Sequence, residues 1–332
     1  MYLHARFLSV ALVISLVFLS GCRSNPAPTT APTTQPQGAT LRSYEYRQIH
    51  MGVQARLVVY APTEQAALEA CRAAYHRIAQ LDDIMSDYRP ASELMRLCAK
   101  AGSGPVPVSP ELFVVLQRSQ EVAQRSQGAF DVTIGPLVKL WRQARKDGQL
   151  PSSEELRKVR TLVGYDKIRL DPEKRTVELL VPGMKLDLGG IAKGYACDQA
   201  IAVLRQHGIT QAVCEMGGDI VVSDAPPGTS GWIIEVTNDL PGHQARKITV
   251  QNAAISTSGD TEQFVVIDGK RYSHIVDPRT GLGLTERSLV TIVADQGLTT
   301  DPLSTAVSIL GPEQGRALAK SYNAQVYIRP PE

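Results

Sequence analysis

Residues 263 to 276 carry the local signal that most constrains the fold, because strand-like runs rich in Val, Ile, Phe and Tyr flank Asp268-Gly269. Such runs on both sides of an Asp-Gly pair predict two strands joined by a tight turn. Polar residues flank this hairpin, namely Ser256, Thr257, Ser258, Asp260, Ser273, His274 and Asp277. Because a hairpin brings its two ends together, we expect these side chains to converge on a site. The alternative is a turn-rich surface loop, where the same residue types accumulate.

Helix and strand signals follow one another along the chain without regular alternation, which favours an α+β fold with mixed sheets and packed helices. Thr63, Ser109-Pro110 and the Ser152–Glu155 capping box predict three helix starts. Other helices are expected over 190–208, 301–310 and 313–321. Strands are expected over 44–60 and 211–223, and near 166–171, 176–181, 184–188, 232–237, 247–250, 288–293 and 325–329.

The N-terminus predicts export. An apolar run from Phe7 to Leu19 follows His4 and Arg6, as in a secretory signal peptide over residues 1–21. The sequence Leu19-Ser20-Gly21-Cys22 resembles a bacterial lipobox, so we expect cleavage to leave Cys22 lipidated. An ordinary signal peptide with a chance cysteine, or an uncleaved anchor, is the alternative.

A Pro/Thr-rich stretch within residues 22–43 predicts an extended linker that spans at most about 60 Å. We therefore expect a folded domain over 44–332, exported and held at a membrane by lipid, facing the periplasm or cell exterior. The hydrophobic content of 43% is sufficient for a real core, and the formal net charge of +2 does not indicate nucleic-acid binding.

The other cysteines form no CxxC pair and show no zinc-ligand spacing. They are Cys71, Cys98, Cys197 and Cys214. Cys71 and Cys197 fall at apolar positions of helical patterns, where small buried thiols are common. We expect free buried thiols, with one disulfide as the alternative because export permits it.

The segment DLGGIAKGYACD, from Asp187 to Asp198, predicts a phosphate-binding strand-to-helix turn. Gly189 and Gly190 allow a ligand to approach the backbone, and the N-terminus of the following helix offers free N–H groups. Lys193 in the first turn adds a mobile positive charge. A tight turn with a surface lysine is the alternative. The G-x-G-x-x-G spacing of a dinucleotide-binding fold is absent.

The segment TDPLSTA, from Thr300 to Ala306, predicts a partial magnesium site. On a helix, Asp301 and Thr305 are four residues apart and share one face. A carboxylate and a hydroxyl are ligands that suit Mg²⁺. Alternatively, Asp301 caps the helix and Pro302 lies in its first turn.

Six ordered segments resemble the ApbE family, the FAD:protein FMN transferases, over about residues 44 to 330. The family resemblance implies a two-lobed, T-fold-like single catalytic domain. The segments are Met51-Gly52, MSDYRPASEL (Met85–Leu94), AFDVTIGPL (Ala129–Leu137), DLGGIAKGYACD, YSHIVDPRTG (Tyr272–Gly281) and TDPLSTA. Within AFDVTIGPL the residues before Gly135-Pro136 look strand-like, and Gly217-Gly218-Asp219 is expected to be a mainly structural turn.

The same resemblance assigns roles to individual residues. It implies metal binding by Asp301, Thr305 and the backbone carbonyl of Gly190. Catalytic roles fall on His274 and Asp301. The residues implied to contact FAD are Met51, Tyr88, Ala129, Phe130, Asp131, Asp187, Lys193, His274 and Ile275.

The implied activity is Mg²⁺-dependent transfer of FMN from FAD to a Thr or Ser hydroxyl of an acceptor protein, with release of AMP. The implied acceptors are flavin-carrying subunits of membrane redox complexes, such as sodium-pumping NADH:quinone oxidoreductase (Nqr) and Rnf-type assemblies. Two alternatives remain from the sequence: a Mg²⁺-dependent FAD pyrophosphatase and a non-catalytic flavin-binding lipoprotein.

Overall fold

A β-hairpin begins the described part of the chain. The computed structural model describes residues 40–236, 246–259, 264–286 and 288–329. The chain divides into two units, Met1–Ala39 and Thr40–Glu332, and every described residue belongs to the second. Strands β1 (Arg42–His50) and β2 (Val53–Ala61) pair across a turn in which Met51 and Gly52 have φ values of 49° and 75°. Two positive φ values match the twist that a two-residue hairpin needs.

The hairpin forms one edge of a seven-stranded sheet with the order β1-β2-β6-β7-β10-β15-β16. All strand pairs among the described residues are antiparallel, so the expectation of mixed sheets is wrong. No parallel neighbours arise because each strand returns beside a partner of opposite direction. The other strands are β6 (Ala212–Met216), β7 (Asp219–Val222), β10 (Ala253–Gly259), β15 (Leu289–Ala294) and β16 (Gln325–Arg329).

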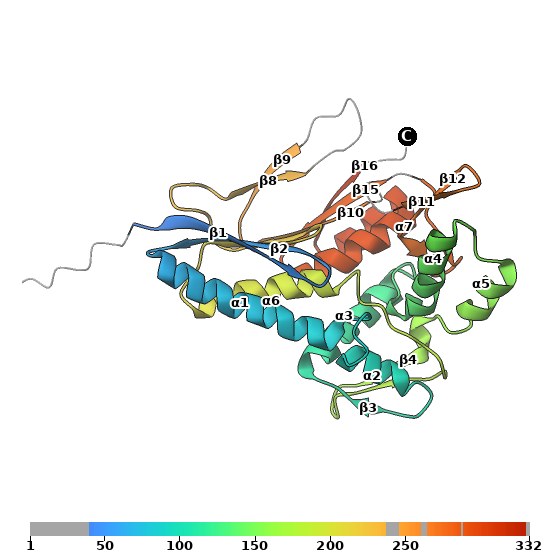
Figure 1. Ribbon diagram of the computed structural model, residues 1–332. Helices are drawn as coiled ribbons and strands as arrows, with labels where there is room; N and C mark the ends of the chain where they lie inside the picture. Colours follow the sequence, from blue (N-terminus) through green and yellow to red (C-terminus); the bar gives the residue numbers. More distant parts are fainter. Residues whose placement is uncertain (1–39, 237–245, 260–263, 287, 330–332) are drawn as a thin grey trace, which may run out of the picture. The chain divides into compact units, whose positions relative to one another are not determined.

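Three helices pack against one face of this sheet (Figure 1). They are α1 (Glu64–Met85), α6 (Ala192–Gln206) and α7 (Gly297–Ser321). Leu57, Cys214 and Ile292 point from the strands into the core beneath them, each 0% exposed. The α+β class is therefore confirmed, with antiparallel sheets and packed helices.

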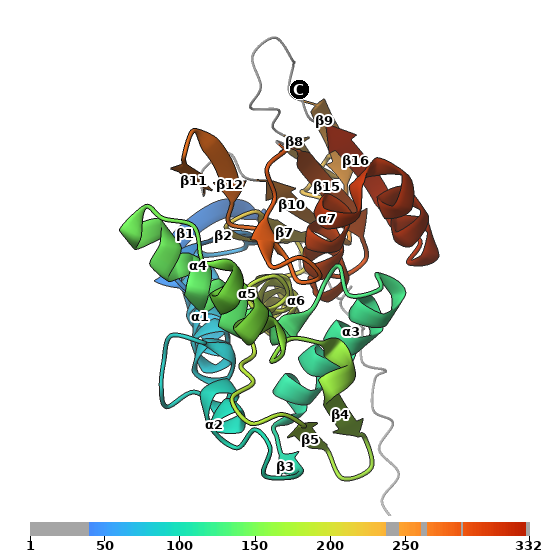
Figure 2. The same cartoon turned by 90° about the vertical axis from the view of Figure 1, so that its right-hand side faces the viewer.

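The remaining elements are shorter, and Figure 2 shows α4 and α5 near the β11–β12 hairpin. A small core joins that hairpin to α4, where the Trp141 and Tyr272 rings lie 5.4 Å apart. The helices are α2 (Glu93–Ala99), α3 (Pro110–Arg125), α4 (Gly135–Asp147) and α5 (Ser153–Arg160), with 3-10 turns η1 (Val132–Ile134) and η2 (Tyr165–Lys167). The strands are β3 (Val106–Pro107), β4 (Ile168–Asp171), β5 (Thr176–Leu179), β8 (Trp232–Val236), β9 (Arg246–Val250), β11 (Phe264–Ile267), β12 (Lys270–Ser273), β13 (Val276–Asp277) and β14 (Leu282–Gly283).

The predicted helix starts are confirmed. Thr63 and Ser109 each accept a backbone N–H three residues ahead, and Ser152 forms a full capping box with Glu155. Gly311, with φ 76°, interrupts α7 just after the predicted helix end at Leu310. The four cysteines from Cys71 onward are free and buried, as predicted.

The following local predictions are wrong. The residues before Gly135 form the 3-10 turn η1 rather than a strand, because Asp131 accepts the N–H of Thr133. Gly135-Pro136 then begins α4 instead of ending a strand. Residues 184–188 form no strand. Helix α7 begins at Gly297, one turn earlier than expected, so Asp301 is not its cap.

Cys22 and Asp260 lie outside the described residues, as do the predicted signal peptide and most of the linker. Within the described residues, no helix combines the length and apolar character needed to cross a membrane.

Candidate active site

The glycine-rich segment between Asp187 and Lys193 is the centre of the candidate active site. Asp187 Oδ1 accepts the N–H of Gly189 at 2.8 Å, and Lys193 Nζ donates to the carbonyl of Gly189 at 2.8 Å. Gly189 is therefore held on both sides, which ties the loop to the first turn of α6. Burial, and then the nearby charge of Asp87, raise the pKa of Asp187.

Lys193 lies between two buried carboxylates that come from distant parts of the chain. Its Nζ atom is 3.1 Å from Asp219 Oδ2 and 3.4 Å from Asp301 Oδ2. Asp219 begins β7 and is 3% exposed, whereas Asp301 lies in α7 and is 4% exposed. From the sequence, Asp219 is expected to belong only to a structural turn. The antiparallel pairing of β6 with β7 brings it to the site, and that pairing has no local signature.

Asp301 is the most perturbed acid of this group. Burial, and then the charge of Asp219, raise the pKa of Asp301 to about 7, against the opposing effects of Lys193 and the Gly194 N–H. That N–H donates to Asp301 Oδ2 at 3.1 Å. Two carboxylates here face one ammonium group, so the site is electrostatically suited to receive a further cation.

Three other predicted residues meet beside this group. A Cβ atom on Gly190 would lie 3.2 Å from Thr305 Oγ1 and 3.4 Å from Phe130 Cε2. Glycine at this position therefore leaves room for the hydroxyl and the ring. Thr305 is one turn after Asp301 in α7, as the four-residue spacing predicts.

The available ligands fit a hard, oxygen-binding cation. No three His, Cys, Asp or Glu side chains are grouped as a metal site within the described residues. A metal bound here would rely on one carboxylate, the Thr305 hydroxyl, the Gly190 carbonyl, and water or substrate oxygens. Mg²⁺ prefers such a ligand set and rarely uses an all-protein cage.

Asp198 joins the two helices that carry the site and is not among the residues predicted from the sequence to be functional. Its carboxylate oxygens accept the N–H groups of Gly297 and Leu298, both at 2.8 Å. Asp198 thus satisfies free donors at the start of α7, where the dipole also favours a negative charge. Burial raises the pKa of Asp198 to about 6. The sequence signal that could have identified Asp198 is its position as the last residue of the segment DLGGIAKGYACD.

The predicted FAD contacts around Phe130 divide into two kinds. Ala129 and Phe130 are buried, and the Phe130 ring reaches the Gly190–Thr305 contact described above. Asp131 Oδ1 accepts both the N–H and the hydroxyl of Thr133, at 2.8 and 2.7 Å. Burial raises the pKa of Asp131. Its carboxylate therefore organises the η1 turn.

Met51 and Tyr88 lie in two other loops. Met51 packs partly buried against the core in the β1–β2 turn. Two residues further, Val53 lies near Gly217, since a Cβ there would be 3.7 Å from Val53 Cγ1 and 3.8 Å from Lys193 Cε. Tyr88, after α1, is 73% exposed, and the guanidinium of Arg142 lies 4.3 Å from its ring centroid.

The polar residues around the predicted hairpin do not all converge. Ser256 and Thr257 belong to β10 inside the large sheet, and their hydroxyls bond to Thr300 and Thr291 at 2.7 and 2.9 Å. Asp277 instead pairs with Arg279, a neighbour two residues away. The expectation failed because residues 253–259 form a central strand, not the approach to the hairpin. His274 is exposed just after β12, and Ile275 is buried beside it.

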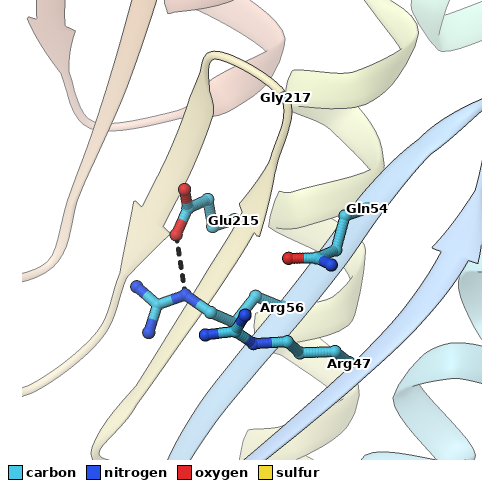
Figure 3. A pocket seen from close by; sticks show the side chains of 5 residues that line it. All are labelled: Arg47, Gln54, Arg56, Glu215 and Gly217. Atoms are coloured by element: carbon cyan, nitrogen blue, oxygen red, sulfur yellow. Dashed lines mark hydrogen bonds and ion pairs between the residues drawn. The ribbon is translucent and has the colours of Figure 1, made fainter.

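A cavity of about 390 Å³ lies beside the Gly217 turn, which contributes to its lining (Figure 3). Arg47, Gln54, Arg56 and Glu215 complete its lining. Arg56 bonds to Glu215 at 2.8 Å and Arg47 pairs with Glu45 at 2.6 Å, so both arginines are already neutralised. None of the residues that the sequence predicted to bind FAD or metal lines this cavity.

Comparison with known proteins identifies the family. The model of the ApbE family matches residues 51–328. The chain belongs to the ApbE family. An FAD:protein FMN transferase of Klebsiella pneumoniae is 33% identical over 83% of this chain and 85% of its own length. One of Treponema pallidum is 31% identical over 86% of this chain and 83% of its own length. These ApbE relatives confirm the predicted enzyme class, FAD:protein FMN transferase.

Solved ApbE structures have the same fold. The apo form of the Pseudomonas stutzeri flavinyl transferase ApbE matches with a TM-score of 0.78 at 28% identity, covering 88% of this chain and 92% of that one. The flavin transferase ApbE of Vibrio cholerae matches with a TM-score of 0.76 at 29% identity, covering 87% and 93% of the two chains.

Proposed function

We propose that this enzyme transfers FMN from FAD to a Thr or Ser hydroxyl of an acceptor protein in a Mg²⁺-dependent reaction that releases AMP. The observation that carries the proposal is the pairing of Lys193 with the buried carboxylates of Asp219 and Asp301, beside Gly190 and Thr305, in a chain of the ApbE family. Its combination of one ammonium and two carboxylates suits a diphosphate together with a divalent cation.

The residues at this centre have distinct tasks in the proposal. Asp301, Thr305 and the carbonyl of Gly190 would hold Mg²⁺, which neutralises phosphate charge when bound. Lys193 is held near the glycine-rich loop, where its ammonium would bind a diphosphate oxygen. Phe130, Tyr88 and Met51 offer apolar or aromatic contacts for the flat ends of FAD.

The bond changes define the products. The acceptor hydroxyl oxygen bonds to the FMN-side phosphorus, and the bond from that phosphorus to the bridging oxygen breaks. AMP leaves with the bridging oxygen, and the hydroxyl proton passes to solvent. Asp301 and His274 are the proposed catalytic residues.

An incubation of the full chain with FAD, Mg²⁺ and candidate acceptor domains tests this activity. Mass spectrometry is expected to find FMN bound to an acceptor Thr or Ser, with AMP in the solution and slow FAD cleavage when no acceptor is present. Rapid formation of free FMN and AMP, with no labelled acceptor, would indicate a pyrophosphatase. FAD binding without any cleavage would indicate a flavin carrier.

We further propose that the enzyme is exported and lipid-anchored at Cys22, facing the periplasm or cell exterior. The support is the lipobox-like sequence before Cys22 and the Pro/Thr-rich linker after it. Such an anchor would place the enzyme beside acceptors that are subunits of membrane redox complexes, of the Nqr or Rnf kind.

Cys22→Ser is expected to release or mislocalise the protein while leaving FMN transfer by the purified chain unchanged, because the linker separates Cys22 from the folded domain. Membrane fractionation and mass spectrometry of the N-terminus measure the effect. A substituted protein that still carries lipid and sediments with membranes would refute the lipobox assignment. Ser20→Thr would be a conservative control, with anchoring retained.

A further inference from the structure

We infer that Arg142 is a positioning residue for FAD, acting through Tyr88 and Asp187. The inference rests on the proposed function, because it takes FAD as the ligand of this site. Arg142 lies in α4, whereas Tyr88 follows α1 and Asp187 precedes α6. One side chain therefore connects three segments that the fold brings together around the proposed cofactor site.

The contacts of Arg142 use its whole guanidinium group. Nη1 lies 2.8 Å from Asp87 Oδ2, Nη2 lies 3.4 Å from Asp187 Oδ2, and the group lies over the Tyr88 ring at 4.3 Å. A planar guanidinium satisfies two carboxylates in its plane and an aromatic ring against its face, which an ammonium group does not.

Tyr88 is fixed by contacts to its backbone and ring, yet much of the residue remains exposed to solvent. Ser86 Oγ accepts the N–H of Tyr88 at 3.3 Å, and the hydroxyl of Ser92 donates to the carbonyl of Ser86 at 2.7 Å. These bonds fix the backbone, and Arg142 fixes the ring. Because Tyr88 is still 73% exposed, it presents aromatic surface on which a flat heterocycle of FAD can stack.

Arg142 also separates two acids that would otherwise repel. Asp87 and Asp187 have side chains only 20% and 13% exposed, and both point at the same guanidinium. Asp187 in turn holds Gly189, whose carbonyl accepts from Lys193. Loss of Arg142 would therefore free the Tyr88 ring and leave Asp187 without this cationic partner, while the bonds of Gly189 to Asp187 and Lys193 remain.

A double-mutant cycle with FAD affinity as the readout tests the inference. Arg142→Met and Tyr88→Leu are each expected to weaken FAD binding by about tenfold. The double variant is expected to bind FAD about as weakly as the single variant with the lower FAD affinity, because the two residues act as one unit. The KM for FAD should rise while kcat stays within about twofold, a split that a general loss of folding would not produce.

Two further variants sharpen the result. Arg142→Lys keeps a positive charge near Asp87 and Asp187 but loses the flat face, so its affinity should fall between wild type and Arg142→Met. Arg125→Met is the matched control, because Arg125 also lies over a tyrosine ring, at 4.6 Å from Tyr322, and pairs with Glu121 at 3.2 Å. It should leave FAD affinity unchanged.

The outcomes separate this inference from the proposed function. If wild type binds FAD but Arg142→Met binds within twofold of it, or if the single losses multiply in the double variant, the positioning role is refuted and the proposed function stands. If wild type does not bind FAD, the proposed function itself fails.

Discussion

Replacing Asp301 by Asn is expected to lower Mg²⁺-dependent FMN transfer by orders of magnitude, about 10²-fold or more. Asp301 supplies the only formal negative charge among the proposed metal ligands, and Asn keeps the shape without that charge. FAD binding should decline much less, because Tyr88, Phe130 and Lys193 remain. Turnover measured over a Mg²⁺ titration, with FAD affinity measured separately, checks the result. Wild-type turnover and Mg²⁺ dependence in the variant would eliminate Asp301 as a ligand.

A pH series on metal-free protein gives a second readout for the same variant. The folded pKa of Asp301 is about 7, above the ordinary value of about 3.9 for an unfolded chain. Between about pH 4 and pH 7, the folded state therefore keeps the proton on Asp301 while the unfolded chain loses it. The contribution of Asp301 to the free energy of unfolding falls as pH rises from about 4 to about 7. In thermal denaturation, Asp301→Asn should flatten this decline of stability with pH. A slope identical to that of wild type would contradict the raised pKa of Asp301.

Gly194→Ala is expected to destabilise the fold by about 3 kcal/mol and to impair activity with it. A Cβ at Gly194 would lie 2.2 Å from the carbonyl oxygen of Gly297 and 2.8 Å from Asp301 Cβ. Helices α6 and α7 would have to separate, and Lys193 and Asp301 lie on those two helices. The gain of about 1 kcal/mol in helix propensity from Gly to Ala offsets only part of the cost.

Urea denaturation of Gly194→Ala and of a control measures this effect. Ala202→Ser adds one atom on a partly exposed position of the same helix and should change stability by less than about 0.5 kcal/mol. If Gly194→Ala proves as stable as wild type, α6 and α7 do not pack as closely as the structure indicates.

The parts of the fold that local chemistry decides were predictable from the sequence. Thr63, Ser109 and Ser152 mark helix starts because side-chain caps need only neighbouring backbone groups. The Asp268-Gly269 turn was equally clear, since positive φ values at both residues, 50° and 73°, suit this pair. Gly311 marked the break in the last helix for the same reason.

The predictions failed where distant groups decide the structure. The first turn of α7 is capped by Asp198, about 100 residues earlier in the chain, so the segment around Gly297 carried no local start signal. The β10 strand was missed because Ser256 and Thr257 are polar. They are accommodated only because Thr300 and Thr291 satisfy their hydroxyls.

The same distinction applies to the candidate site. Asp187, Lys193, Asp301 and Thr305 were selected from motifs, and the structure brings Lys193 to Asp301 and Thr305 to Gly190. Asp219 and Arg142 escaped notice because each depends on tertiary placement: Asp219 on sheet pairing, and Arg142 on the meeting of three loops and helices.

The two carboxylates beside Lys193 have a consequence for which anions the site binds. A lysine with no partner would attract any phosphate in the surroundings, and inorganic phosphate would then compete with FAD. Here the ammonium already faces the carboxylates of Asp219 and Asp301, so a bare anion meets repulsion from the same acids. A ligand that arrives together with a divalent cation meets no such repulsion. We therefore expect this site to favour metal-bound nucleotides over ambient phosphate, and free phosphate to be a poor inhibitor.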